Sequence, residues 1–392
     1  MFESLLPYRK EVALDLIQQI SAKTLPHALL FSGVPFSGRL SLALETARIV
    51  SCANDGASLC SCASCRSFAR YAMHNVIFVG SRNHKIRIES ALTNFTELRT
   101  KESQRQLLRA LRMMLLQFHS ALLDSSTQRQ GAAFDAAAEI DETLFALEEA
   151  SSDEFPAYAE KLQSLLKPLL TTTNRATSLT IGQVRSLQEW TLHTSFEHRP
   201  RWIILEGVEH STVGTRNSLL KLLEEPPKQT FIVLISEHPT RLLPTILSRV
   251  QHFHIRPFSE DEKNRLLAEV FFADGSTYTS LYHYILERSG IPCQRLTKQA
   301  QEFLERIGSH VVLSHKELSA LCEEFDEQVS LEYFFDEFLT AVRQKYLQGE
   351  FTAKESSRLA KIAGEAKGKA TLFNQNKKLL VESLHYRLQE EL

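Results

Sequence analysis

Two glycines could form a phosphate-binding loop (P-loop). Gly33 and Gly38 have the spacing of the pattern GxxxxGK followed by Ser or Thr. In a working P-loop, backbone N–H groups wrap the phosphates, the lysine reaches the β and γ phosphates, and the hydroxyl holds magnesium. Here Arg39 takes the lysine position and Leu40 the hydroxyl position. Because leucine offers no oxygen to a hard cation, we expect a loop kept for its shape, with a productive ATP site as the alternative.

The acid pair of an ATP-hydrolysing site is also incomplete. The apolar run at 202–205 ends in Glu206 and Gly207. Hydrolysis needs an acid at the first position to hold magnesium and a glutamate next to it to position water. Glu206 could partly serve the first role, but Gly207 cannot serve the second. The loss of two independent motifs indicates that the fold is kept and hydrolysis is not.

Four of the six cysteines lie close together, at Cys52, Cys60, Cys62 and Cys65. Four thiolates suit tetrahedral zinc, which can hold together a loop that has no core of its own. The Cys62-x-x-Cys65 spacing is usual for zinc, whereas Cys60-x-Cys62 is tighter. We expect a structural zinc ion. Four reduced thiols, or a redox pair at Cys62 and Cys65, are the alternatives.

A parallel sheet would position these residues. Short runs rich in Ile, Val and Leu suit strands that are buried on both faces. A helical stripe of leucines at 219–223 ends before Pro226, because proline lacks the backbone N–H. Strand, helix and strand over 202–235 therefore predict a right-handed βαβ unit. A further short strand and an amphipathic helix are expected over 178–196. The expected core strands lie at 28–32, 74–80, 202–205, 231–235 and 250–255.

The remaining segments have helical patterns. A stretch from about 86 to 177, almost without glycine, predicts about three helices. Lys101, Arg105, Arg109 and Arg112 form one basic face there, which could meet DNA phosphates or be an ordinary solvated face. Ser259 and Glu262 predict a capping box that opens a small helical pair. Five helices should follow, at 295–307, 315–326, 330–348, 352–365 and 371–391.

The composition limits the function. Lys plus Arg number 45 and Asp plus Glu 47, so a net charge of −2 argues against a protein that coats DNA. No apolar run reaches the ~20 residues that span a bilayer. The N-terminus lacks the features of a signal peptide. Clustered cysteines in a large chain suggest a reducing compartment. We expect a cytoplasmic protein.

Several motifs together resemble the clamp-loader subunits of bacterial DNA polymerase III. They are PHALLFSGVPFSGR at 26–39, the cysteine cluster, NSLLKLLEEPP at 217–227 and LLPTILSR at 242–249. The resemblance implies an α/β AAA+ P-loop-type core with a parallel sheet, a small helical lid domain and an all-α C-terminal collar domain. The implied domains are 1–257, with a zinc module at 52–65 and a helical insertion at about 86–177, then 258–292 and 293–392. The insertion has no counterpart in the family pattern.

The resemblance is to the delta-prime type rather than the gamma/tau type. Gamma/tau subunits keep an intact P-loop and acid pair, whereas delta-prime often does not but keeps a Ser-Arg-Cys element. This chain has Ser248-Arg249-Val250. The resemblance implies that Arg249 is an arginine finger for the ATP site of a neighbouring subunit, with Ser248 supporting its loop. Gly33, Gly38, Arg39 and Glu206 would be remnants of a nucleotide site.

The implied partners are gamma/tau-type and delta-type subunits in a hetero-oligomer, away from membranes. Through that complex the chain would help to load the sliding clamp on primed DNA during replication. A gamma/tau-type ATPase with an atypical P-loop is the alternative. A scaffold protein that uses the same fold for unrelated partners is a third possibility.

Overall fold

The computed structural model describes most of the chain in two compact units, Met1–Ser289 and Gly290–Leu392. The described residues are 1–57, 59–80, 83–122, 131–173, 179–192, 199–309, 311–325, 328–373 and 376–391.

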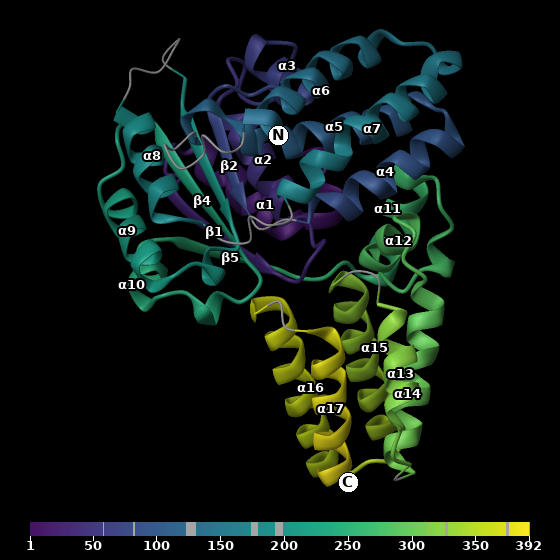
Figure 1. The fold of residues 1–392 in the computed structure, drawn as a ribbon. Helices are drawn as coiled ribbons and strands as arrows, with labels where there is room; N and C mark the ends of the chain where they lie inside the picture. Colours follow the sequence, from purple (N-terminus) through teal and green to yellow (C-terminus); the bar gives the residue numbers. More distant parts are fainter. Residues whose placement is uncertain are drawn as a thin grey trace. The chain divides into compact units, whose positions relative to one another are not determined.

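The first unit is built on a five-stranded parallel sheet with the strand order β2-β3-β4-β1-β5 (Figure 1). This confirms the predicted α/β core. The strand expected at the start of 178–196 is wrong for the part that the structure describes, which forms helix α8 (Ile181–Leu192), while 178 and 193–196 lie outside the described residues. The strands are β1 Ala28–Gly33, β2 Val76–Gly80, β3 Arg201–Glu206, β4 Thr230–Ser236 and β5 Gln251–Ile255.

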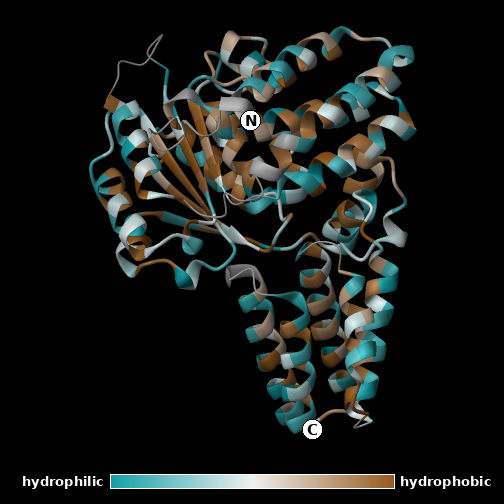
Figure 2. Cartoon of the chain, viewed as in Figure 1, coloured by the Kyte–Doolittle hydropathy of each residue, from teal (hydrophilic) through white to brown (hydrophobic). Residues whose placement is uncertain are grey.

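Both faces of the sheet are covered, which explains why β1 to β4 are mostly hydrophobic along their length (Figure 2). The edge strand β5 instead alternates exposed His252 and His254 with buried Phe253 and Ile255. Successive side chains point to opposite faces. Phe31 and Trp202 belong to the apolar cluster shared with α1 and α2, and Leu30 and Ile203 to the cluster shared with α8 and α9. The first cluster includes residues of α1 Leu6–Ser21, α2 Arg39–Val50 and α3 Ala63–Arg70, and the second includes residues of α9 Val213–Glu224 and α10 Pro244–Leu247.

The helical insertion has its own core. Its described residues form four α-helices where about three were expected, and buried side chains such as Phe95, Leu111 and Leu144 form one apolar cluster. The helices are α4 His84–Leu98, α5 Lys101–Leu115, α6 Gly131–Glu149 and α7 Phe155–Thr173.

Short 3-10 helices also occur in the described part of the first unit. They are η1 Leu116–Phe118, η2 Ser120–Leu122, η4 Ser152–Glu154, η6 Val208–His210, η7 Pro239–Arg241 and η8 Gly275–Thr277.

Two lid helices follow the sheet. The predicted capping box is confirmed, because Ser259 accepts from the Glu262 N–H and Glu262 accepts from the Ser259 N–H. These helices are α11 Glu260–Phe271 and α12 Leu281–Arg288, and they belong to the same compact unit as the sheet.

The second unit is helical throughout its described part. The helix expected to end at 365 continues to 373, because the buried face carrying Leu359, Ala363 and Ala366 outweighs the cost of about 1 kcal/mol for a glycine in a helix. Its helices are α13 Cys293–Gly308, α14 His315–Glu323, α15 Gln328–Leu347, α16 Ala353–Phe373 and α17 Lys377–Glu391. Within the described ranges, no helix combines the length and apolarity needed to cross a membrane.

Gly33 and Gly38 are required by the backbone at the end of β1. Gly33 has φ +150° and pairs with Ile255 of β5, so close that an added Cβ would lie 2.2 Å from the Ile255 carbonyl oxygen. Gly38 has φ +84° and begins α2. Packing against β5 is therefore sufficient reason for a glycine at position 33, whether or not a phosphate binds.

The substitution Gly33→Ala should lower the free energy of unfolding by about 3 kcal/mol or more, because β5 must shift away from the new methyl group. Gly38→Ala should cost only about 1–2 kcal/mol of backbone strain, since its Cβ would meet no atom closer than 3.7 Å. Denaturant unfolding of the two variants measures the difference. Equal losses would contradict this account of the loop.

Candidate functional site

The P-loop lies between β1 and α2, and its distinguishing side chains are engaged with the protein itself. Arg39 is 5% exposed, and its Nη2 lies 3.0 Å from Oε1 of Glu237, just after β4. Leu40 is buried in the apolar cluster beneath the loop. The lysine position is therefore occupied by an ion-paired guanidinium, and the hydroxyl position belongs to the hydrophobic core.

A second buried arginine, Arg9 of α1, lies against the same loop. Its Nε donates to the carbonyl of Ser37 (2.9 Å), and its guanidinium stacks on Phe258 at 3.8 Å. Both side chains come within 3.8 Å of where a Cβ on Gly38 would be. Burial lowers the pKa of Arg9 to about 10, so it stays charged at neutral pH.

The donors at this loop fit an anion better than a magnesium nucleotide. Nη2 of Arg9 and Nη1 of Arg39 are buried and have no hydrogen-bond partner among the described residues. Guanidinium groups bind phosphate oxygens well. Magnesium needs oxygen ligands, and Leu40 supplies none. The residues present therefore do not fit a hydrolytic magnesium site.

The two acidic residues at the end of β3 and just after it, Glu206 and Glu209, lie in different surroundings. Glu206 ends β3, opposite Gly80 and Ile235 on the neighbouring strands. Glu209 in η6 is 7% exposed, and its Oε1 accepts from the backbone N–H groups of Glu237 (2.8 Å) and His238 (3.3 Å). Glu209 therefore holds the chain that follows β4.

The four cysteine sulfurs converge. Their Sγ atoms all lie within 4.8 Å of one another, with Cys52 3.6 Å from Cys60 and 4.0 Å from Cys62. A zinc ion with Zn–S bonds of about 2.3 Å needs sulfurs about 3.8 Å apart. The donor set therefore fits tetrahedral zinc, and the short Cys60-x-Cys62 spacing does not prevent it. Cys62 is the N-cap residue of α3. A redox Cys-x-x-Cys pair begins a helix that follows a strand, whereas a loop precedes α3.

Arg48 organises the loop that carries the cysteines. It pairs with Glu45 (2.7 Å), donates to the carbonyls of Gly56 and Ala57, and lies 3.2 Å from the Cys65 sulfur. A cation beside the sulfurs offsets part of the negative charge of four thiolates.

The thiol pKa values differ across the cluster. Burial opposes ionisation of Cys62, but N–H groups of Cys65 and Ala53 outweigh it and lower the pKa of Cys62 to about 6. Burial and the contact with Cys52 raise the pKa of Cys65 to about 12. A bound metal would deprotonate its thiol ligands outright.

Arg249 follows α10 on the surface. Its Nη2 pairs with Oε1 of Glu224 at 2.6 Å, and its Nη1 donates to the Thr245 carbonyl (2.8 Å) and the Ser248 hydroxyl (3.1 Å). The side chain is 34% exposed. Ser248 also donates to the Thr245 carbonyl, so it closes the turn that carries the guanidinium.

The basic face expected on α5 is not a free cationic stripe. Arg112 is 9% exposed and pairs with Glu148 at 2.7 Å, so its place on a solvated face was predicted wrongly. Lys101 donates to the Ala150 carbonyl, and Arg105 pairs with Glu102. Lys101, Arg105 and Arg109 are exposed, so three of the four residues fit the alternative of an ordinary solvated face.

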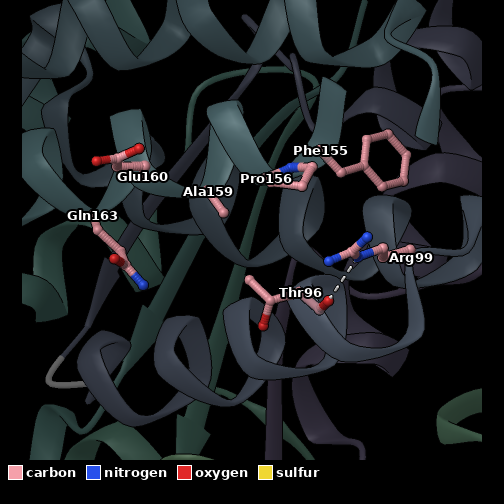
Figure 3. Close-up of a pocket in the computed structure, with 7 residues that line it drawn as sticks. All are labelled: Thr96, Arg99, Phe155, Pro156, Ala159, Glu160 and Gln163. Carbon is pink, nitrogen blue, oxygen red and sulfur yellow. Dashed lines mark hydrogen bonds between the residues drawn. The ribbon is translucent and has the colours of Figure 1, made fainter. Parts of the chain in front are cut away.

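A pocket of about 220 Å³ lies in the insertion, between α4 and α7 (Figure 3). In its wall Arg99 donates through Nε to the Thr96 carbonyl at 3.3 Å. None of the site residues predicted from the sequence lines it. Its lining residues are Thr96, Arg99, Phe155, Pro156, Ala159, Glu160 and Gln163.

The sequence alone did not identify Arg9, Arg48, Glu224 or Glu237. Glu224 lies inside the NSLLKLLEEPP motif, which gave a local signal for it. Arg48 and Glu45 have the i,i+3 spacing of a helical ion pair, a pattern too common to indicate a metal site.

The comparisons with known proteins agree with the resemblance to clamp-loader subunits. A segment of the chain is 42% identical over 80 residues to the DNA polymerase III subunit delta' of Bacillus subtilis, covering 20% of this chain and 24% of the relative. Another is 44% identical over 69 residues to the delta' subunit of Pseudomonas aeruginosa, covering 18% and 21%. The gamma/tau subunit of Mycobacterium bovis is 26% identical over 110 residues, covering 28% of this chain and 19% of the relative. The matches thus span about a quarter or less of these relatives.

A crystal structure of a DNA polymerase III gamma subunit-related protein from Thermotoga maritima covers 55% of this chain and 80% of its own, with 19% identity and a TM-score of 0.29. That likeness is too low to establish a shared fold. The family model described as "DNA polymerase III, delta subunit" matches residues 8–118 and 103–259, which is more than half of the chain. The chain therefore belongs to the DNA polymerase III delta subunit family.

Proposed function

We propose that the chain is a non-hydrolysing clamp-loader subunit of the delta-prime type. It would work with gamma/tau-type and delta-type subunits in a cytoplasmic hetero-oligomer that loads the sliding clamp on primed DNA. The observation that carries this proposal is a contrast between two arginines. Arg39 of the P-loop is buried in an ion pair with Glu237, whereas Arg249 is held at the surface.

The P-loop supports a chain that does not hydrolyse ATP. Arg39 is tied to Glu237, and Leu40 is part of the core. Without a hydroxyl ligand for magnesium and a glutamate after Glu206, two requirements of phosphoryl transfer are missing. An anion could still be held by the buried arginines.

The geometry of Arg249 supports a role in trans. A planar, always charged guanidinium suits the charge that spreads over a transferring phosphoryl group. The carboxylate of Glu224 and the Ser248 turn hold this guanidinium at the chain surface. Because exposed ion pairs contribute only about 0–1 kcal/mol, a neighbouring triphosphate could readily replace Glu224.

Zinc is proposed as the structural cofactor. Cys52, Cys60, Cys62 and Cys65 would hold it, with Arg48 beside them. When bound it would cross-link the loop between α2 and α3, which has little apolar core.

Replacing Arg249 tests the finger. The Arg249→Ala chain should still assemble with the partner subunits. The reconstituted complex should lose a large share of the ATPase activity that DNA and the clamp stimulate. The rate of ATP hydrolysis at the neighbouring ATP site that receives Arg249 should fall by about 10³-fold or more. Arg249→Lys should lose most of the same activity, because the ammonium cannot form the planar fork.

The matched control is Arg241→Ala, an exposed arginine eight residues earlier, which should leave the ATPase unchanged. Normal stimulated ATPase in Arg249→Ala would reject the finger. Failure of the chain to join the complex would instead favour the scaffold role for unrelated partners.

Metal analysis tests the zinc site. The chain purified under reducing conditions should carry about one zinc per molecule, and Cys62→Ser should lose it and unfold at least about 5 °C lower. Cys60→Ser tests the ligand with the short spacing and should behave in the same way. Cys322→Ser, outside the cluster, should keep its zinc. A fresh reduced preparation with little or no zinc would count against the assignment.

A further inference from the structure

The insertion contacts the last lid helix through a buried polar network. Helices α4 and α12 pack side by side (Figure 1). Asn94 of α4 is 2% exposed. Its Nδ2 donates to the Tyr284 hydroxyl (2.9 Å), and its Oδ1 accepts from Arg288 Nε (2.8 Å). Arg288 also pairs with Glu97 at 2.6 Å, about one turn further along α4. Two side chains of this insertion helix, Asn94 and Glu97, thus hold Tyr284 and Arg288 of α12.

The same network reaches the other lid helix. Gln106 of α5 accepts from Asn94 Nδ2 (3.4 Å) and donates through its Nε2 to the Val270 carbonyl in α11 (2.5 Å). Four helices, α4, α5, α11 and α12, therefore share one set of hydrogen bonds. Buried polar groups favour a single arrangement, because separating the helices leaves them unpaired.

A third contact includes the P-loop. Phe36, which has φ +60°, contacts the Arg87 guanidinium of α4, whose Cζ lies 4.1 Å from the ring centroid. The Phe36 ring also stacks on Tyr282 of α12, with 5.0 Å between centroids and 26° between planes. Core loop, insertion and lid therefore meet at one aromatic ring.

We propose that the insertion is a latch that holds the lid on the core. Lids on short linkers commonly move when a ligand binds. Here the lid follows β5 through a linker of a few residues, and α1 adds a contact from Tyr8 to Glu269 (3.0 Å). The contacts from α4 and α5 remove the remaining freedom of α11 and α12. The latch gives the insertion a role that does not depend on Arg249 acting as a finger.

Hydrogen exchange measured by mass spectrometry on the full chain tests the latch. The double variant Arg87→Ala with Arg288→Gln removes the contact of Arg87 with the Phe36 ring and the ion pair of Arg288 with Glu97. Both positions are partly exposed, so the fold should persist. Amides of α12 should then exchange at least about tenfold faster, while those of β1 and β4 keep their protection. Asn94→Ala, which breaks the buried centre of the network, should give the same local pattern.

The matched control is Arg265→Gln, which removes an arginine of α11 that pairs within its own helix with Glu269. It should leave exchange in α12 unchanged. Unchanged exchange in α12 in both the double variant and Asn94→Ala would overturn the latch. An equal rise across the sheet would also overturn it, because that is the sign of general destabilisation.

Discussion

The ion pair between Arg39 and Glu237 is the contact on which the character of the P-loop depends. It joins the start of α2 to the chain after β4, at the sheet edge where ligands of open α/β folds bind. A buried guanidinium needs such a partner, because an unpaired buried charge is costly. The pairing therefore uses side chains at the carboxyl edge of the sheet to stabilise the fold. Glu209 adds to this stabilisation, because it accepts hydrogen bonds from the backbone N–H groups of Glu237 and His238.

The Ser248 turn, the cysteine loop and the insertion are each held by side-chain contacts of their own. Ser248 closes the turn after α10, and Arg48 of α2 donates to the backbone of the cysteine loop. The insertion packs around its own core and ties the lid through Asn94. At the positions that hold lysine and a hydroxyl in a working P-loop, Arg39 pairs with Glu237 and Leu40 packs in the core.

Much of this fold could be predicted from local patterns. The strands followed from short apolar runs, and the end of α9 from Pro226. The cysteine cluster was visible because its members are close in sequence. Glycine was a weaker guide: α16 continues through Gly364 because packing of its buried face outweighs helix propensity. The partners of Arg39 and Asn94 lie 198 and 190 residues away. Only tertiary packing brings such groups together, so no local pattern could have indicated them.

We propose that the P-loop does not support magnesium-dependent nucleotide chemistry. Equilibrium binding of ATP to the isolated chain, with and without magnesium and followed by a turnover assay, tests it most directly. We expect no turnover, and any weak binding through Arg9 and Arg39 should not depend on magnesium. Tight, magnesium-dependent binding accompanied by hydrolysis would contradict the account and favour an ATPase of the gamma/tau type.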